Sequence, residues 1–126
     1  MATIVHFELP ADDVDRAKGF WEGVFGWSFQ GGDAPFPYLM TQGEEPVGAI
    51  YPSQEGERGP VVYMATTDID ATLAKVAEAG GEAGEKTPIP QTGWFARCKD
   101  TEGNSFSLFQ GDENAPGDWG QPTPVD

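Results

Sequence analysis

The same order of elements occurs in both halves of this 126-residue chain, and this repeat limits the folds open to it. In each half a strand pattern leads to an Asp-X-Asp triplet, at residues 13–15 and 68–70, and then to apolar residues at helical spacing. Three further strand patterns follow each helix. The repeat spans about 50 residues but occurs only twice, whereas a solenoid needs three or more copies. The sequence therefore predicts two strand-helix-three-strand modules facing each other about a pseudo-twofold axis.

The first module is expected over residues 3–52 and begins with a strand at 3–9. Alternation places His6 and Glu8 on one face of this strand, and Pro10 is expected to end it. Three short strands are expected later in this module, at residues 27–30, 36–41 and 47–51.

The helix of the first module is expected to begin at Asp12 or Asp13 and to end at Gly26. Its apolar residues recur at helical spacing and are Val14, Ala17, Phe20, Trp21, Val24 and Phe25. This apolar face predicts burial, so Phe20 and Trp21 are expected in the core rather than against a cofactor.

The second module is expected over residues 61–110, after a polar linker at 53–60. Its parts are a strand at 61–66, a helix from Asp68 to the Gly80-Gly81 pair, a short strand near 82–84 and a hairpin at 93–110. Residues 1–110 would then form a single domain, followed by an irregular tail at 111–126 that is rich in Gly, Pro and acidic residues. Either Trp119 packs into a groove and holds this tail against a surface or, if no groove receives it, the tail is disordered.

The hairpin is the most explicit part of the pattern, because its turn fixes its register. The Asp100 side chain can bond the backbone two residues on, and Gly103 supplies positive φ. A three-residue loop pairs Asp100 with Asn104.

That register sets which side chains share a face of the hairpin. Arg97 is expected opposite Ser107, and Phe95 opposite Phe109, on one face. Cys98 is expected on the other face with Phe106 and Leu108, as a small buried hydrophobe rather than a nucleophile.

The composition narrows the classes of partner. The formal charge of −14 comes from 21 acidic and 7 basic residues, so nucleic acids and anionic membrane surfaces would be repelled. The same charge would favour cationic small molecules, although solubility alone explains it more simply. One cysteine excludes an intrachain disulfide, and no apolar run reaches ~20 residues, so a cytoplasmic protein is expected.

An ordered set of short motifs in both halves carries a family resemblance. The motifs are His6-Phe7-Glu8, Asp13-Val14-Asp15-Arg16-Ala17, Phe20-Trp21, Phe25-Gly26-Trp27, Asp68-Ile69-Asp70-Ala71-Thr72-Leu73, Ala79-Gly80-Gly81, Asp100 and Glu102-Gly103-Asn104. This set resembles the vicinal-oxygen-chelate superfamily of glyoxalases, bleomycin-resistance proteins, extradiol dioxygenases and fosfomycin-resistance enzymes, and within it a glyoxalase-like branch. The resemblance implies an α+β fold of two βαβββ modules, whose curved mixed sheets form a shared half-barrel cavity. It also implies a homodimer.

The resemblance further implies a divalent metal held by about four His, Glu or Gln side chains. His6 fits the first of these positions. The other positions fall within residues 48–51, at Val61 and at Ser107, none of which offers a good ligand. Glu8, Tyr63 and Gln110 lie nearby as substitutes, but Gln110 points away from Ser107. We therefore expect neither a metal nor another cofactor.

His6 and Glu8 are open to two interpretations. They can form a ligand-contacting acid/base pair. The simpler alternative is a buried polar network, in which Glu8 meets Arg97 and His6 bonds the backbone or water.

Three hypotheses of function follow. The first is a metal-independent small-molecule-binding protein that holds a ligand, preferably a cationic one, in the cavity between the modules. The expected lining residues are His6, Glu8, Tyr63, Phe95, Arg97, Ser107 and Phe109. The second is a lyase, isomerase or dioxygenase with a relocated metal or acid/base site around His6 and Glu8. The third is a structural or interaction protein with a vestigial cavity. The sequence assigns no catalytic residue and leaves open whether the protein is an enzyme.

Overall fold

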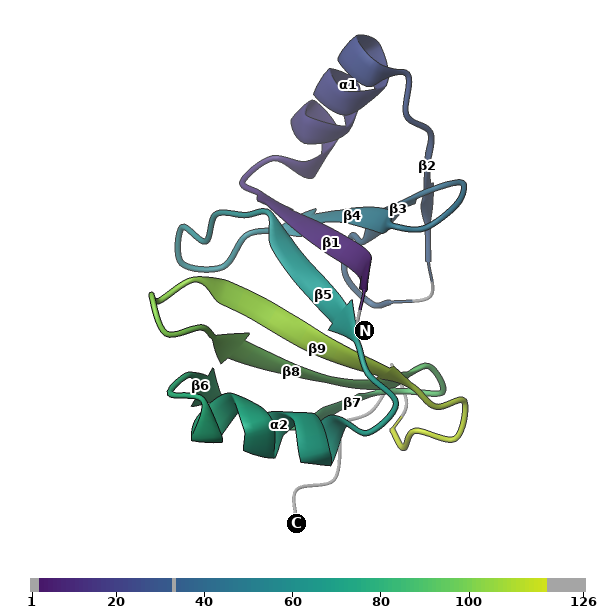
Figure 1. The fold of residues 1–126 in the computed structure, drawn as a ribbon. Coiled ribbons are helices and arrows are strands. Elements are labelled where there is room, and N and C mark those ends of the chain that lie inside the picture. The colour runs from purple at the N-terminus through teal and green to yellow at the C-terminus, as the bar shows by residue number, and fades with distance from the viewer. Residues whose placement is uncertain (1–2, 33, 118–126) are drawn as a thin grey trace. The chain divides into compact units, whose positions relative to one another are not determined.

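A computed structural model describes residues 3–32 and 34–117 of the chain. The fold is α+β and contains the two predicted βαβββ modules (Figure 1). Contacts divide the chain into an N-terminal unit, Val5–Val61, and a C-terminal unit made of Val62–Asp126 with Met1–Ile4. Each unit is described by itself below.

The N-terminal unit is a small mixed sheet with one helix. Its elements are β1 (Ile4–Ala11), α1 (Val14–Phe25), β2 (Phe29–Gly31), β3 (Leu39–Thr41) and β4 (Val47–Pro52). The strands follow the order β2-β3-β4-β1, in which β1 and β4 are parallel and the other pairs antiparallel. The three short strands expected after the helix are present, but β2 begins and ends later than predicted and β3 begins later.

Pro10 does not end β1, contrary to the prediction. The strand continues to Ala11, and Pro10 pairs with Tyr51 of β4. The Ala11 carbonyl accepts from the Ser53 amide at 2.9 Å, so the backbone N–H and C=O of Ala11 face β4. Along a strand these backbone groups face alternate sides, so those of Pro10 face away from β4. Proline has no N–H, and at this position β4 loses no hydrogen bond because of it.

Helix α1 has the predicted ends. The side chain of Asp13 accepts from the Arg16 amide at 3.0 Å, and Gly26 closes the helix with φ 70°. The Gly26 N–H donates to the Glu22 carbonyl at 3.0 Å. This left-handed conformation strains residues that carry a Cβ, so glycine suits the position.

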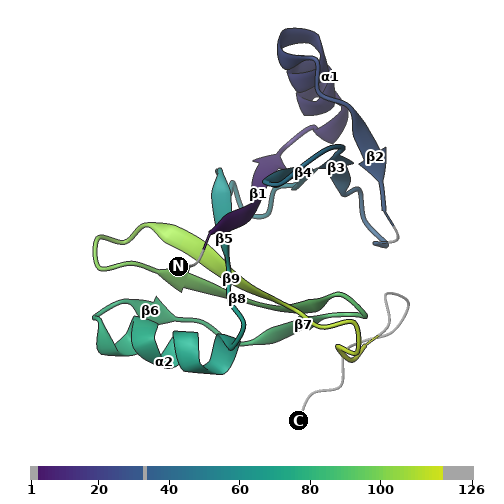
Figure 2. The ribbon, with the colours of Figure 1, turned by 45° about the vertical axis from the view of Figure 1, so that its right-hand side comes forward.

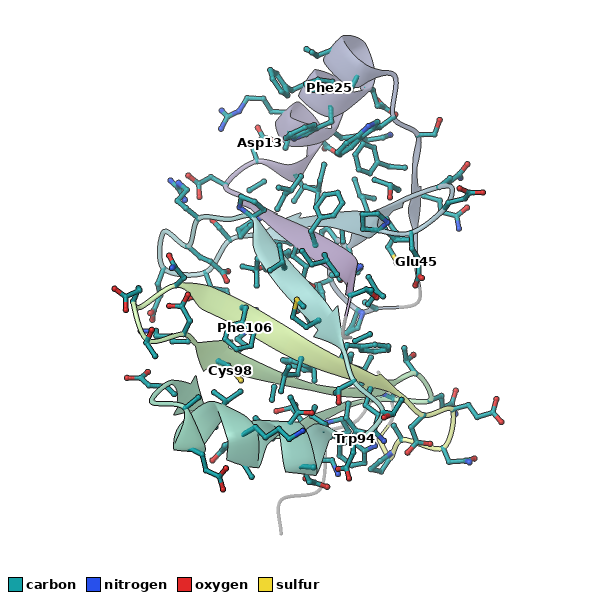
Figure 3. All side chains as sticks on the ribbon, in the orientation of Figure 1. Asp13, Phe25, Glu45, Trp94, Cys98 and Phe106 are labelled. Atoms are coloured by element: carbon teal, nitrogen blue, oxygen red, sulfur yellow. The ribbon has the colours of Figure 1, made fainter. Side chains whose placement is uncertain are left out.

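The expected burial of α1 is wrong for Phe20. No residue of the helix is buried, and Phe20 is 55% exposed. Trp21 is half-buried and stacks on Trp27, with ring centroids 4.8 Å apart. Adjacent residues differ by about 100° around a helix axis, so turning Trp21 inward turns Phe20 aside. Phe25, at the end of α1 (Figure 3), is also 56% exposed.

The C-terminal unit has a sheet with one helix on one face. Its elements are β5 (Val61–Ala65), α2 (Ile69–Glu78), β6 (Glu82–Ala83), β7 (Thr87–Ile89), β8 (Gly93–Lys99) and β9 (Ser105–Gly111). The strands follow the order β5-β9-β8-β6, with β7 also paired to β8. Strands β5 and β9 are parallel, and α2 lies along the sheet in both views (Figures 1 and 2).

Strand β7 was not predicted. Strands β6 and β7 pair with successive parts of β8, so they form one edge strand that is interrupted between Ala83 and Thr87. The interruption begins at Gly84, where an added Cβ would lie only 1.9 Å from the Arg97 carbonyl oxygen. Pro88 hides this strand in the sequence, because proline is tolerated in sheets mainly at edges.

The core of the C-terminal unit lies between the sheet and α2. Its buried residues are Ile69, Ala96, Cys98 and Leu108, with Met64, Leu73, Val76, Trp94 and Phe106 packed around them. Cys98 is 4% exposed and lies between β8 and α2 (Figure 3), which confirms it as a small buried hydrophobe.

The hairpin has the predicted register. Arg97 pairs with Ser107, Phe95 with Phe109 and Cys98 with Phe106. The Asp100 N–H donates to the Asn104 carbonyl at 2.9 Å. Local chemistry at the turn was therefore sufficient to fix this pairing.

The turn residues also have the predicted roles. The Asp100 carboxylate accepts from the amides of Glu102 at 2.8 Å and Asn104 at 2.9 Å. Gly103 has φ 86°. The side chain of Asn104 donates to the same carboxylate, and this bond is the main reason why the pKa of Asp100 lies below its ordinary value.

After β9 the chain turns back onto the β7–β8 loop. The Asp112 amide donates to the Thr92 carbonyl at 2.9 Å, and the Gln91 amide donates to the Ala115 carbonyl at 3.0 Å. Ala115 is 3% exposed. The alternatives for Trp119 fall outside the described residues. Neither helix in the described part of the chain is long and apolar enough to cross a membrane.

Candidate functional site

A hydrogen-bonded chain of three polar side chains lies on one face of the N-terminal sheet. Glu8 and His6 project from β1, and Tyr38 directly precedes β3. Tyr38 Oη donates to Glu8 Oε2 at 2.6 Å and lies 2.9 Å from His6 Nε2. His6 Nε2 and Glu8 Oε2 are 3.9 Å apart, and their side chains are 18% and 9% exposed. His6 and Glu8, the two residues predicted from the sequence, therefore both bond to the hydroxyl of Tyr38, which the sequence did not reveal.

The chain of hydrogen bonds has a direction. An ionised carboxylate only accepts, so the single proton of the Tyr38 hydroxyl is directed to Glu8. The Tyr38 oxygen must then accept from His6, which places a proton on Nε2. The order is His6 Nε2–H to Tyr38 Oη–H to Glu8 Oε2.

The register of the sheet explains how Tyr38 reaches Glu8. Ala49 of β4 pairs with Glu8 on one side and with Met40 on the other. Alternation then puts Tyr38 on the same face as Met40 and Glu8. Ala49 carries only a methyl group between these strands, which leaves room for a tyrosine to cross. The Tyr51 ring lies 6.3 Å from Tyr38, centroid to centroid.

The polar network at His6 and Glu8 includes the phenol of Tyr38, which neither interpretation of the sequence contained. Tyr38 falls within the strand expected at 36–41, but its face depends on how β3 pairs with β4. The residues between these two strands, 42–46, predict a turn but do not fix the register of the strands. A tyrosine in an alternating strand was visible in the sequence, but only the register of β3 against β4 shows that it lies on the same face as Glu8.

The other five predicted lining residues share one face of the C-terminal sheet, opposite α2. Tyr63 pairs with Ser107, and Ser107 pairs with Arg97, so the three form a row across β5, β9 and β8. The adjacent row contains Phe109 and Phe95. Ser107 is 0% exposed and Tyr63 6%. The two phenylalanines are half-buried, and Arg97 is exposed.

The residues present do not fit the metal site that the resemblance implies. Position 61 is a valine and position 107 a serine, and Gln110 uses its side-chain oxygen to accept from the Ile69 amide at 2.8 Å. Among residues 3–32 and 34–117, no group of three or more His, Cys, Asp or Glu side chains could hold a metal ion. No chemical step is therefore assigned to a metal.

A groove of about 450 Å³ lies beside the first turn of α1, and none of the predicted site residues lines it. Its charged residues are Asp12, Asp13, Arg16 and Arg58. Asp12 and Arg58 form an ion pair of 3.2 Å across its rim, with side chains 58% and 66% exposed. The pKa of Asp12 is lowered, first by the hydrogen bond from Ser53 and then by Arg58. These groups satisfy one another at the surface, so the groove is a weaker candidate than the His6 face.

Sequence comparison relates the chain to glyoxalase-like proteins. Residues 3–37 match the family described as bleomycin resistance protein-like N-terminal. A glyoxylase-like domain-containing protein of Didymella fabae is 31% identical over 113 residues, which cover 80% of this chain and 88% of that protein. CFP32 of Mycobacterium tuberculosis, whose name suggests a glyoxylase, is 33% identical over 114 residues. That match covers 86% of this chain but 44% of CFP32, so the chain spans less than half the length of this relative.

Solved structures share the fold. A hypothetical protein from Bacillus halodurans superposes with a TM-score of 0.72 at 15% identity, covering 92% of this chain and 99% of that one. A methylmalonyl-CoA epimerase in complex with methylmalonyl-CoA and NH4+ superposes with a TM-score of 0.70, with the same identity and coverage. Sequence similarity over most of the Didymella protein, together with this fold, shows that the chain belongs to the vicinal-oxygen-chelate superfamily of glyoxalases and bleomycin-resistance proteins.

Proposed function

We propose that this protein binds a small molecule without a metal and holds it against the His6–Tyr38–Glu8 face of the N-terminal sheet. The observation that carries the proposal is the hydrogen-bonded chain itself. It sets a carboxylate with a 9% exposed side chain beside a phenol and an imidazole. Polar groups that are sheltered yet reachable are typical of ligand sites, where a few of them fix orientation.

Glu8 is the group on this face best suited to a ligand. It is 7% exposed, and the Tyr38 hydroxyl holds one of its oxygens in place. A carboxylate offers about four lone pairs, so it can accept from a ligand while Tyr38 stays bound. Shelter from water strengthens such a bond to a cationic ligand. The formal charge of −14 would also attract cations from solution.

The experiment uses benzylamine as a cationic probe and benzyl alcohol as its neutral counterpart, observed by NMR on the 15N-labelled full chain. Benzylamine is expected to shift the amide resonances of β1 and the alcohol to shift them less. The Glu8→Gln variant should lose the benzylamine response, whereas Glu22→Gln, on the exposed surface of α1, should keep it. An equal response in both variants would overturn the proposal.

Metal independence is tested separately by thermal unfolding. The melting temperature should not change in Zn²⁺, Mn²⁺, Ni²⁺ or Fe²⁺, because the residues that the structure describes offer no suitable donor set. Stoichiometric metal after purification without chelator, with a raised melting temperature in one of these ions, would contradict this part.

A second candidate, an acid/base isomerase, is favoured by the direction of the same chain. A proton on His6 Nε2 can be passed through Tyr38 toward Glu8, as general acid/base chemistry requires. One structural neighbour is an epimerase that was solved with methylmalonyl-CoA. Incubation with methylmalonyl-CoA in D2O distinguishes the two candidates. Deuterium entering the substrate faster than in buffer, and not with Tyr38→Phe, would establish the isomerase, and exchange at the buffer rate would remove this candidate.

A further inference from the structure

Helix α1 exposes two large apolar side chains on one face. Phe20 is 55% and Val24 59% exposed, and no residue of the helix is buried. These two residues are four apart, so their side chains form a ridge along the helix that begins at Arg16. Single exposed apolar residues are normal, whereas neighbouring ones on the same face mark interaction surfaces. The ridge therefore indicates an interaction surface on this side of α1.

A groove without side chains runs beside this ridge. Gly19 and Gly23 are also four residues apart. A Cβ added at either glycine would meet nothing within 4 Å in the part of the chain that the structure describes, and neither glycine has a positive φ. Glycine is unfavourable inside a helix, and nothing local in α1 requires it at these two positions. The Gly19–Gly23 groove instead allows another helix to approach the backbone of α1 closely.

The acidic residues of α1 lie away from this face. Successive residues differ by about 100° around a helix axis, so Asp15 and Glu22 lie about 140° and 160° from Phe20. The ridge itself carries a cation, Arg16, which is exposed. The last turn of α1 contains no basic residue, although the carbonyl end of a helix favours a positive charge. One end of the face thus offers a cation, and the other end lacks one.

A second copy of α1 fits this face in both shape and charge. Ridges of residues four apart pack into grooves of the same kind when two helices cross at about −50°. Helix α1 carries the ridge and the groove side by side, so a twofold axis can place the ridge of each copy in the groove of the other. In the antiparallel arrangement, Arg16 of each copy reaches the carbonyl end of the other α1, which has no basic residue of its own.

We propose that two copies of this protein associate through α1, with the Phe20–Val24 ridge of each copy in the Gly19–Gly23 groove of the other. A helix of 12 residues is about 18 Å long, so this contact is smaller than the roughly 800 Å² per partner of a standard interface. We therefore expect a weak dimer, with a dissociation constant of about 10 µM or more. The inference goes beyond the proposed function because it concerns α1 and a protein partner. The family resemblance implies a homodimer but names no surface for it.

The test measures the self-association of the full chain by sedimentation equilibrium, at concentrations on both sides of that value. The mass is expected to rise from monomer to dimer as the concentration increases. Added salt should strengthen the association, because it screens the repulsion between two copies that each carry a formal charge of −14. In NMR spectra of the 15N-labelled chain, the same increase in concentration should shift the amide resonances of α1.

A matched pair of variants tests the ridge. Val24→Ser removes an apolar side chain from it and should weaken self-association roughly tenfold. Ile4→Ser is the control, because Ile4 is a similar side chain, 47% exposed, on β1 rather than α1. It should leave the dissociation constant within a factor of about two.

Gly23→Leu tests the groove and separates a specific fit from general apolar contact. It adds a side chain where the single chain has room, so the melting temperature should stay the same or rise. It also fills the groove, so self-association should weaken roughly tenfold, although the exposed apolar surface has grown. Glu22→Leu adds the same side chain on the opposite side of α1 and should leave the dissociation constant within a factor of about two.

Three outcomes would overturn the proposal. A mass that stays monomeric at every concentration would show that no second copy covers the ridge. A dimer that persists unchanged in Val24→Ser and Gly23→Leu would place the interface on another surface. Stronger association of Gly23→Leu would mean that the contact is unspecific apolar association. The benzylamine response is read from β1, so this proposal and the proposed function fail separately.

Discussion

Tyr38 donates a 2.6 Å hydrogen bond to Glu8, a residue 30 positions earlier in the chain. The bond links β1 to the segment that precedes β3, across β4. The same hydroxyl lies 2.9 Å from Nε2 of His6. One tyrosine therefore orders both polar residues of the candidate site.

Removing this hydroxyl should destabilise the protein measurably. Tyr38→Phe keeps the ring and deletes a bond to a sheltered carboxylate, so we expect a loss of about 1–3 kcal/mol in the free energy of unfolding. Urea denaturation of Tyr38→Phe, Glu8→Gln and the double variant gives the coupling between the two side chains. A coupling below about 0.3 kcal/mol would show that the bond contributes nothing to stability.

A residue's position could be predicted from the sequence when the residues that determine it lie close to it in the chain. The register of the hairpin at 93–110 was predicted correctly because Asp100 and Gly103 specify the turn within five residues. Tyr38 was missed because its face depends on how β3 pairs with β4, and the turn residues between these strands do not fix that register. Phe20 was misplaced because apolar periodicity gives the direction of a helical face but not how wide a contact the sheet makes with it.

A pair of glycine substitutions tests the close approach at the sheet edge. Gly84→Ala would place a methyl group 1.9 Å from the Arg97 carbonyl oxygen, which is backbone and cannot rotate away. We expect a loss of about 2 kcal/mol or more in the free energy of unfolding, typical of overpacking. Gly19→Ala is the matched control, because its added Cβ meets nothing within 4 Å in α1. It should stabilise the protein by up to ~1 kcal/mol. Equal effects of the two changes would contradict the geometry at Gly84.

The difference in burial between Ile69 of α2 and Phe20 of α1 is also testable. Ile69 is 0% exposed in the core, so Ile69→Ala should lower the free energy of unfolding by about 2–5 kcal/mol. Phe20, which is 55% exposed, should lose less than about 1.5 kcal/mol on change to Ala, mainly its edge contact with Trp21. Chemical denaturation of both variants decides this. A loss at Phe20 as large as that at Ile69 would mean that Phe20 is buried in solution.

The turn of the hairpin should show a defined pH dependence. The pKa of Asp100 lies below its ordinary value of 3.8, mainly because of the Asn104 side-chain hydrogen bond, followed by the backbone amides of Asn104 and Glu102. A lowered folded-state pKa means that the native state favours the ionised carboxyl. The stabilisation is therefore complete above the unfolded-state pKa and is lost as the pH falls through the folded-state value.

An NMR titration of the carboxyl resonances should give a midpoint below 3.8 for Asp100, and Asn104→Ala should raise it. Asp112 is the internal control, because its pKa is lowered first by the Trp94 indole and then by the Asn114 amide. It should keep its midpoint in the Asn104→Ala variant. If both midpoints move together, the change is global and the assignment of the shift to Asn104 is wrong.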